Sequence, residues 1–108
     1  TDLNWASRLD AVVEHWIRFE FENHELYHAV FHAVATADEP WDEARRLLGQ
    51  LVQGGVAAGE FDLEDLQTET VVEFLLHAYA GPCLHHADIE SAIVDTQKLF
   101  RRAVGALN

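Results

Sequence analysis

The stretch FEFENHELYHAVF, from Phe19 to Phe31, indicates where one helix ends and the next begins. Asn23 in its middle is a favourable N-cap, because its side-chain oxygen can accept a hydrogen bond from a free backbone N–H of the next turn. Apolar residues then recur at the spacing of an amphipathic helix, namely Leu26, Tyr27, Val30, Phe31 and Val34. The stretch therefore predicts two consecutive helices joined by a capped turn.

Composition extends this prediction to the whole chain of 108 residues, which has the size of a single domain, 1–108. A hydrophobic content of 49% supports a core, and only two prolines, without long β-branched runs, indicate an all-α fold. The net charge of −12 excludes binding to nucleic-acid phosphates and to anionic membrane surfaces. No apolar run reaches the length of a membrane span.

We expect five helices. They run from about Leu3 to Phe21, from Asn23 to about Ala37, from Pro40 to a stop at Gly59, from about Asp65 to His86, and from the cap Asp88 to Leu107. Gly81-Pro82 predicts a kink or break inside the fourth of them. That helix is apolar nearly all round, so it must be covered on several sides, and a second subunit would supply such cover.

Catalytic motifs are missing from the sequence. The single cysteine, Cys83, excludes an intrachain disulfide, fits a reducing cytosol, and lies in an apolar helical stretch that favours an inert thiol. Neither a Ser-based or Cys-based nucleophile motif nor a Gly-rich phosphate loop is present. We therefore expect a cytoplasmic protein that is not an enzyme and needs no cofactor.

Four motifs in order resemble the ligand-binding half of TetR-type repressors. FENHELYHAVF resembles the family's ENPELYRLVF junction between two helices of the regulatory domain. LLGQLVQGGVAAGEFD, from Leu47 to Asp62, resembles the helix and Gly-x-Phe turn that lead into the dimer-forming helices. ETVVEFLLHAYAGPCLHH and DIESAIVDTQKLFRRAVGAL resemble those two helices themselves. The order and spacing of these motifs are more specific than any one of them.

The resemblance implies a five-helix effector-binding and dimerisation domain of a TetR-like transcriptional regulator. The family's N-terminal helix-turn-helix domain is absent from this sequence, so the chain itself should not contact DNA. A small apolar or aromatic molecule is the implied effector, and a homodimer formed by the last two helices is the implied assembly.

Two sets of residues follow from this interpretation. The effector pocket is expected to be lined by Trp16, Phe19, Tyr27, Phe31, Leu51, Phe74 and His77, with Tyr27 and His77 as its hydrogen-bonding groups. The two-fold dimer contact is expected to hold Val71, Leu75, Ala78, Tyr79, Ile93, Gln97, Phe100 and Val104. The assignment of faces is open, because both helices carry two apolar stripes.

Seven histidines allow a competing hypothesis. His24, His28 and His32 stand four residues apart along one helix face, and a pair of histidines at this spacing can chelate a transition metal. The alternative is therefore a metal-binding helical bundle. Against it, the places of His28 and His32 are commonly taken by polar surface residues in the family that the chain resembles.

Overall fold

The computed structural model describes residues 4–22, 39–78 and 88–106, which contain four helices and no strand. The helices are α1 (Trp5–Glu22), α3 (Glu39–Ala57), α4 (Thr68–Ala78) and α6 (Ile89–Ala103). The all-α prediction is therefore confirmed for these residues. The second expected helix, from Asn23 to about Ala37, and the Gly81-Pro82 break lie outside the described residues. The second helix, and with it the total of five, therefore stays a prediction.

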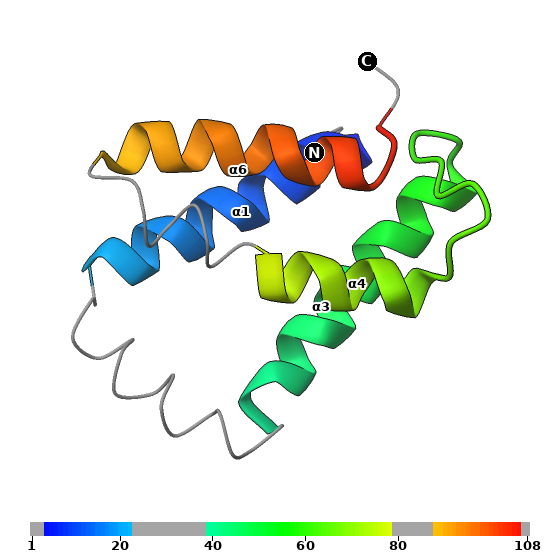
Figure 1. The fold of residues 1–108 in the computed structure, drawn as a ribbon, viewed down its shortest axis with the longest axis horizontal. Coiled ribbons are helices and arrows are strands. Elements are labelled where there is room, and N and C mark those ends of the chain that lie inside the picture. Colours follow the sequence, from blue (N-terminus) through cyan, green and yellow to red (C-terminus); the bar gives the residue numbers. More distant parts are fainter. Residues whose placement is uncertain (1–3, 23–38, 79–87, 107–108) are drawn as a thin grey trace.

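The helices pack in two pairs that share one core. α6 lies along α1, and α4 packs across α3 (Figure 1). α1 also contacts α3, and α4 contacts α6. The centre of the core is formed by fully buried side chains from all four helices, among them Leu9, Leu48, Leu75 and Ala92. None of the helices in the described ranges combines the length and apolar character that a membrane crossing needs.

The predicted helix ends at Gly59 and Asp88 are confirmed. Gly59 has a φ of +79°, and the N–H of Glu60 donates to the carbonyl of Gly55 at 2.8 Å, which closes α3 with a Schellman motif. Asp88 caps α6, because its carboxylate accepts hydrogen bonds from the N–H groups of Glu90 and Ser91. Both helix ends depend on hydrogen bonds between residues that are close in the sequence, and for this reason sequence patterns predict them well.

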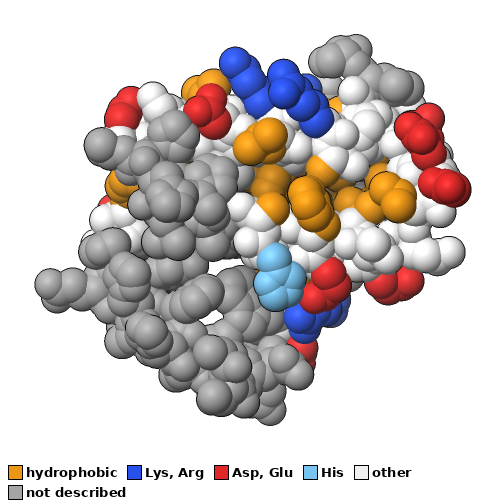
Figure 2. All heavy atoms as spheres, in the orientation of Figure 1, with side chains coloured by type: hydrophobic (Ala, Val, Ile, Leu, Met, Phe, Trp, Pro, Cys, Tyr) orange, Lys and Arg blue, Asp and Glu red, His pale blue; other side chains and the backbone are white. Residues whose placement is uncertain are grey.

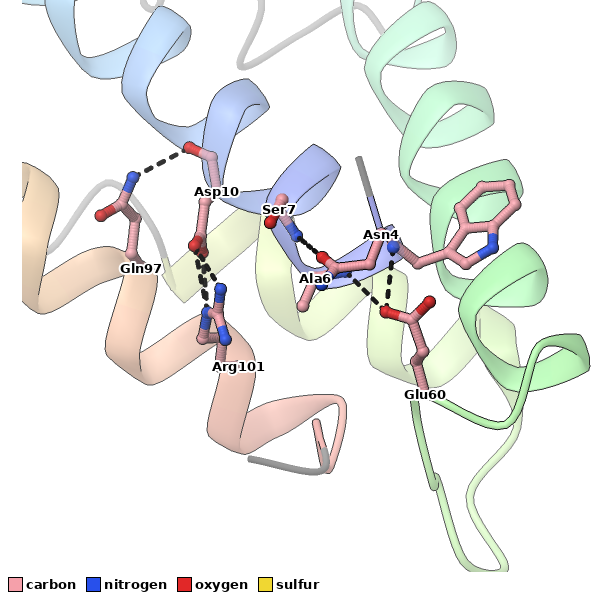
Figure 3. A network of polar contacts seen from close by, with 8 residues as sticks. Asn4, Ala6, Ser7, Asp10, Glu60, Gln97 and Arg101 are labelled. Carbon is pink, nitrogen blue, oxygen red and sulfur yellow. Dashed lines mark hydrogen bonds and ion pairs between the residues drawn. The ribbon is translucent and has the colours of Figure 1, made fainter. Parts of the chain in front are cut away.

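The loop after α3 joins the start of α1 to the end of α6. Glu60 Oε1 accepts hydrogen bonds from the N–H groups of Trp5 at 2.9 Å and Ala6 at 3.3 Å, which satisfies two free donors of α1 (Figure 3). The N–H of Asp62 donates to the carbonyl of Val104 at 3.0 Å. One short loop thus fixes two chain segments that are far apart in the sequence.

α6 is held to α1 by polar contacts as well as by the core. The Arg101 guanidinium donates to both carboxylate oxygens of Asp10, at 2.6 to 3.1 Å (Figure 3). This contact raises the pKa of Arg101 above its ordinary value. Gln97 Nε2 donates to the backbone carbonyl of the same aspartate at 3.0 Å. Gln97, which the sequence placed in a dimer contact, is therefore engaged within its own chain.

Candidate functional site

An open apolar groove between α4 and α6 is the main candidate site in the described part of the chain. It encloses about 320 Å³, at the lower end of the range of ligand pockets. Its apolar lining comes from Phe74, Leu75 and Ala78 of α4 and from Leu99, Phe100 and Ala103 of α6. Hydrophobic side chains gather between these two helices on the face that Figure 2 shows.

The groove forms because both helices carry apolar residues beyond the stripe that they bury. α4 buries Val71, Val72, Leu75 and Leu76. Phe74 lies on its other side and is 61% exposed. α6 buries Ala92, Ile93, Thr96 and Phe100, whereas Leu99 is 50% exposed. Large apolar side chains left in water on two adjacent helices mark a surface that associates with another molecule.

Two polar residues complete the groove. Thr96 is fully buried, and its Oγ1 has no hydrogen-bond partner among the residues that the structure describes. Arg102 lies at the rim and is exposed. A buried hydroxyl that forms no hydrogen bond carries a desolvation cost. Thr96 is thus a polar position in a floor that is otherwise apolar.

Most of the residues predicted for the dimer contact are buried in the core of a single chain. Less than 5% of each side chain is exposed in the single chain for Val71, Leu75, Ile93, Phe100 and Val104. Leu75 and Phe100 form the floor of the groove. Ala78 does line the groove. Tyr79 lies outside the described residues. The exposed apolar residues of the two helices are their neighbours Phe74, Leu99 and Val94.

The residues predicted for the effector pocket are not brought together where they are described. Leu51 is buried in the core, and Trp16 packs against that core. Phe19 on α1 is 51% exposed. Phe74 lines the groove instead, and Tyr27 and Phe31 lie outside the described residues.

The remaining predicted pocket residue, His77, is at the surface. Its side chain is 81% exposed, and its Nε2 lies 3.7 Å from Oε1 of Glu73. Glu73 also accepts hydrogen bonds from Arg45 of α3, which lower the pKa of its carboxyl. His77 thus lies beside Glu73 at the solvent-exposed surface rather than in an apolar cavity.

Sequence reasoning missed Leu99, Thr96 and Arg102. Leu99 belongs to the apolar pattern of its helix, but the pattern does not tell which of two stripes faces the core. The unpartnered hydroxyl of Thr96 has no signal in the sequence.

The metal hypothesis concerns residues that the structure does not describe, namely His24, His28 and His32. Within the described ranges, no group of three or more His, Cys, Asp or Glu side chains is placed to hold a metal ion. The hypothesis therefore stays a prediction.

No family model, curated protein or solved structure matches the chain.

Proposed function

We propose that this chain is the effector-sensing and dimerisation domain of a TetR-like transcriptional regulator. The observation that carries the proposal is the open apolar face shared by α4 and α6. These are the two helices whose sequences resemble the dimer-forming helices of that family. The order of the helices along the chain fits the same resemblance.

The proposed dimer is a two-fold contact in which the α4–α6 face of one copy covers the same face of the other. Phe74 and Leu99 are its anchors, because burial of large apolar side chains supplies most of the free energy of association. This choice replaces residues such as Phe100, which is 2% exposed. A charge at Phe100 would disrupt the core of the single chain and would report nothing about dimerisation.

The sensing part of the proposal follows from the dimer. A small apolar or aromatic effector would change the relative arrangement of the two copies, to the extent that it binds one arrangement more tightly than the other. That change would be passed to a helix-turn-helix domain that is not in this sequence. The chain would thus control DNA binding without contacting DNA.

Leu99→Glu tests the dimer. We expect native mass spectrometry and sedimentation to find a dimer for the unaltered chain and a monomer for this variant, because the contact would have to bury an unpaired carboxylate. Leu47→Glu is the matched control, since Leu47 is an exposed leucine of α3 outside the groove. Circular dichroism should show that both variants keep their helices.

Two results would contradict the proposal. One is a monomeric unaltered chain at concentrations well above those of a stable regulator. The other is a dimer that withstands Leu99→Glu, which would place the contact on another face. A mass increment from a co-purified organic molecule would supply the mass of an effector.

A further inference from the structure

We infer that the groove between α4 and α6 binds an amphiphile with an apolar chain and a single terminal anion. The apolar chain lies along Phe74, Ala78 and Leu99, and the anion lies at Arg102 and Lys98. This site is separate from the effector pocket predicted from the sequence, and it needs no relationship to any family.

The groove suits an unbranched apolar chain. It is a trough between two helices, with exposed apolar side chains on both walls and buried ones, Leu75 and Phe100, at its floor. Its volume of about 320 Å³ is at the lower end of the range of ligand pockets and fits a small ligand. An apolar ligand chain bound here would also remove Phe74 and Leu99 from water. The free energy gained is proportional to the apolar area that is covered.

The anion is indicated by the distribution of positive charge. The chain has seven Lys and Arg residues, all within the described ranges. Four of them pair with carboxylates of the same chain: Arg18, Arg45, Arg46 and Arg101. A fifth, Arg8, stacks on the ring of Trp5 at 4.3 Å.

Lys98 and Arg102 are the two cations that remain, and neither forms an ion pair with a residue that the structure describes. They stand four residues apart on α6, so they lie on the same side of the helix. Lys and Arg side chains lie beside the apolar band in Figure 2. Arg102 lines the apolar groove, and Lys98 lies with it in the adjoining hollow. In a chain of net charge −12, two cations that form no ion pair with a described residue are complementary to an anionic ligand.

The residues around a second hollow, next to the groove, indicate that the head group of the ligand carries one negative charge only. Arg102 lines both the groove and an adjoining open hollow, which also holds Lys98, Arg101, Asp62 and Glu64. Arg101 is engaged with Asp10, so two unpaired cations and two carboxylates border the space for the head group. A carboxylate can bind the cations there, whereas a polyphosphate would be repelled by Asp62 and Glu64.

The amphiphile and a second copy of the chain would cover the same residues, Phe74 and Leu99. Binding of the amphiphile should therefore oppose the dimer, and this consequence rests on the proposed function. The binding site itself does not, and the experiment keeps the two apart.

The test uses three probes built on a ten-carbon chain: decanoate, decanol and decyltrimethylammonium. The two ionic probes are kept below the concentration at which they form micelles, and decanol is kept below its solubility limit. Isothermal titration calorimetry of the full chain should find one decanoate per chain. Decanoate should bind about tenfold more tightly than decanol, because it adds a charge-assisted contact. Decyltrimethylammonium should bind most weakly of the three.

Arg102→Gln should remove the preference for decanoate over decanol and leave the binding of decanol unchanged. Arg46→Gln is the control, because it deletes another exposed arginine, on α3 and outside the groove, and changes the net charge by the same amount. Equal binding of decanoate and decanol to the unaltered chain would overturn the inference. So would an equal loss of decanoate binding in both variants, since that would reflect net charge alone.

Native mass spectrometry separates this inference from the proposed function. A chain that is monomeric and still binds decanoate through Arg102 would overturn the dimer and support the site. A dimer that neither binds decanoate nor dissociates in its presence would overturn the site and leave the proposed function standing.

Discussion

At the scale of single residues, the pair Gly54-Gly55 shows how close packing overrides helix propensity. Both glycines lie inside α3, where each weakens a helix by about 1 kcal/mol relative to alanine. The structure gives the compensation: a methyl group at Gly54 would overlap the ring of Trp5, and one at Gly55 would overlap the ring of Phe61. The two aromatic rings approach α3 more closely than any larger residue would allow.

Gly55→Ala should therefore lower the free energy of unfolding by about 1–3 kcal/mol, because Phe61 is buried and cannot easily move away. Gly49→Ala is the control within the same helix, since a methyl group at Gly49 meets no atom within 4 Å. It should raise the free energy of unfolding by about 0.5–1 kcal/mol through propensity alone. Urea unfolding followed by circular dichroism measures both changes, and stabilisation by both variants would contradict the packing argument.

At the scale of secondary-structure elements, α3 and α4 are connected by an ion pair as well as by the core. The Arg45 guanidinium donates to both carboxylate oxygens of Glu73. These hydrogen bonds lower the pKa of Glu73 below its ordinary value of 4.5, although partial burial acts in the opposite direction. Both side chains are more than a third exposed, so the pair contributes less than about 1 kcal/mol.

The sign of its pH dependence follows from the lowered pKa. A carboxyl whose pKa is lower in the folded state stabilises the fold above its unfolded pKa, and this contribution is lost as the pH falls through the folded pKa. Between neutral pH and values below 4.5, the unaltered chain should therefore lose more stability than Glu73→Gln. Asp65→Asn is the control, because Asp65 is exposed and contacts no cation among the described residues.

Thermal unfolding at a series of pH values would measure this difference. Identical pH profiles for the unaltered chain and Glu73→Gln would show that the contact between Arg45 and Glu73 contributes no stability in solution. Asp65→Asn keeps the pair between Arg45 and Glu73, so it should lose stability in acid like the unaltered chain. An acid loss for Asp65→Asn as small as that of Glu73→Gln would contradict the assignment.

At the scale of the whole molecule, net charge and apolar surface act against each other in the proposed dimer. Each copy carries a net charge of −12, so two copies repel each other at low ionic strength. The proposed contact is apolar at its centre, with Phe74 and Leu99 as its largest exposed side chains. Salt screens the repulsion between exposed charges and leaves apolar burial in place.

The dimer should therefore become tighter as sodium chloride is raised from about 0.01 M to about 0.15 M, where the screening length falls from roughly 30 Å to 8 Å. Sedimentation equilibrium across this range measures the dissociation constant directly. A dissociation constant that rises with salt would show instead that ion pairs dominate the contact. Lys98 and Arg102 would then be the residues to substitute first.

Several ends of the described helices could be read from the sequence, but α6 ends at Ala103 rather than at Leu107, and α4 begins at Thr68 rather than at about Asp65. The expected first helix, from about Leu3 to Phe21, is close to α1 at Trp5–Glu22. The cap at Asp88 and the stop at Gly59 are also found where expected. These features depend on hydrogen bonds and backbone angles within a few residues, which the local sequence specifies.

The faces of the last two helices could not be predicted in this way. Phe100 and Leu99 are neighbours in the sequence and similarly apolar, yet the first is 2% exposed and the second 50%. The same holds for Leu75 and Phe74 on α4, which are 0% and 61% exposed. Periodicity alone leaves both stripes of each helix as candidates for the core.

By itself, then, the sequence determined the all-α class of the described residues, the cap of α6, the stop of α3 and the acidity of the chain. Only the tertiary structure decided which stripes meet in the core, which form the groove, and which two cations form no ion pair with a described residue. The physical reason is that caps and helix periods arise between residues close in the chain. Burial and ion pairing, as between Arg101 and Asp10, arise between residues brought together only when the helices pack.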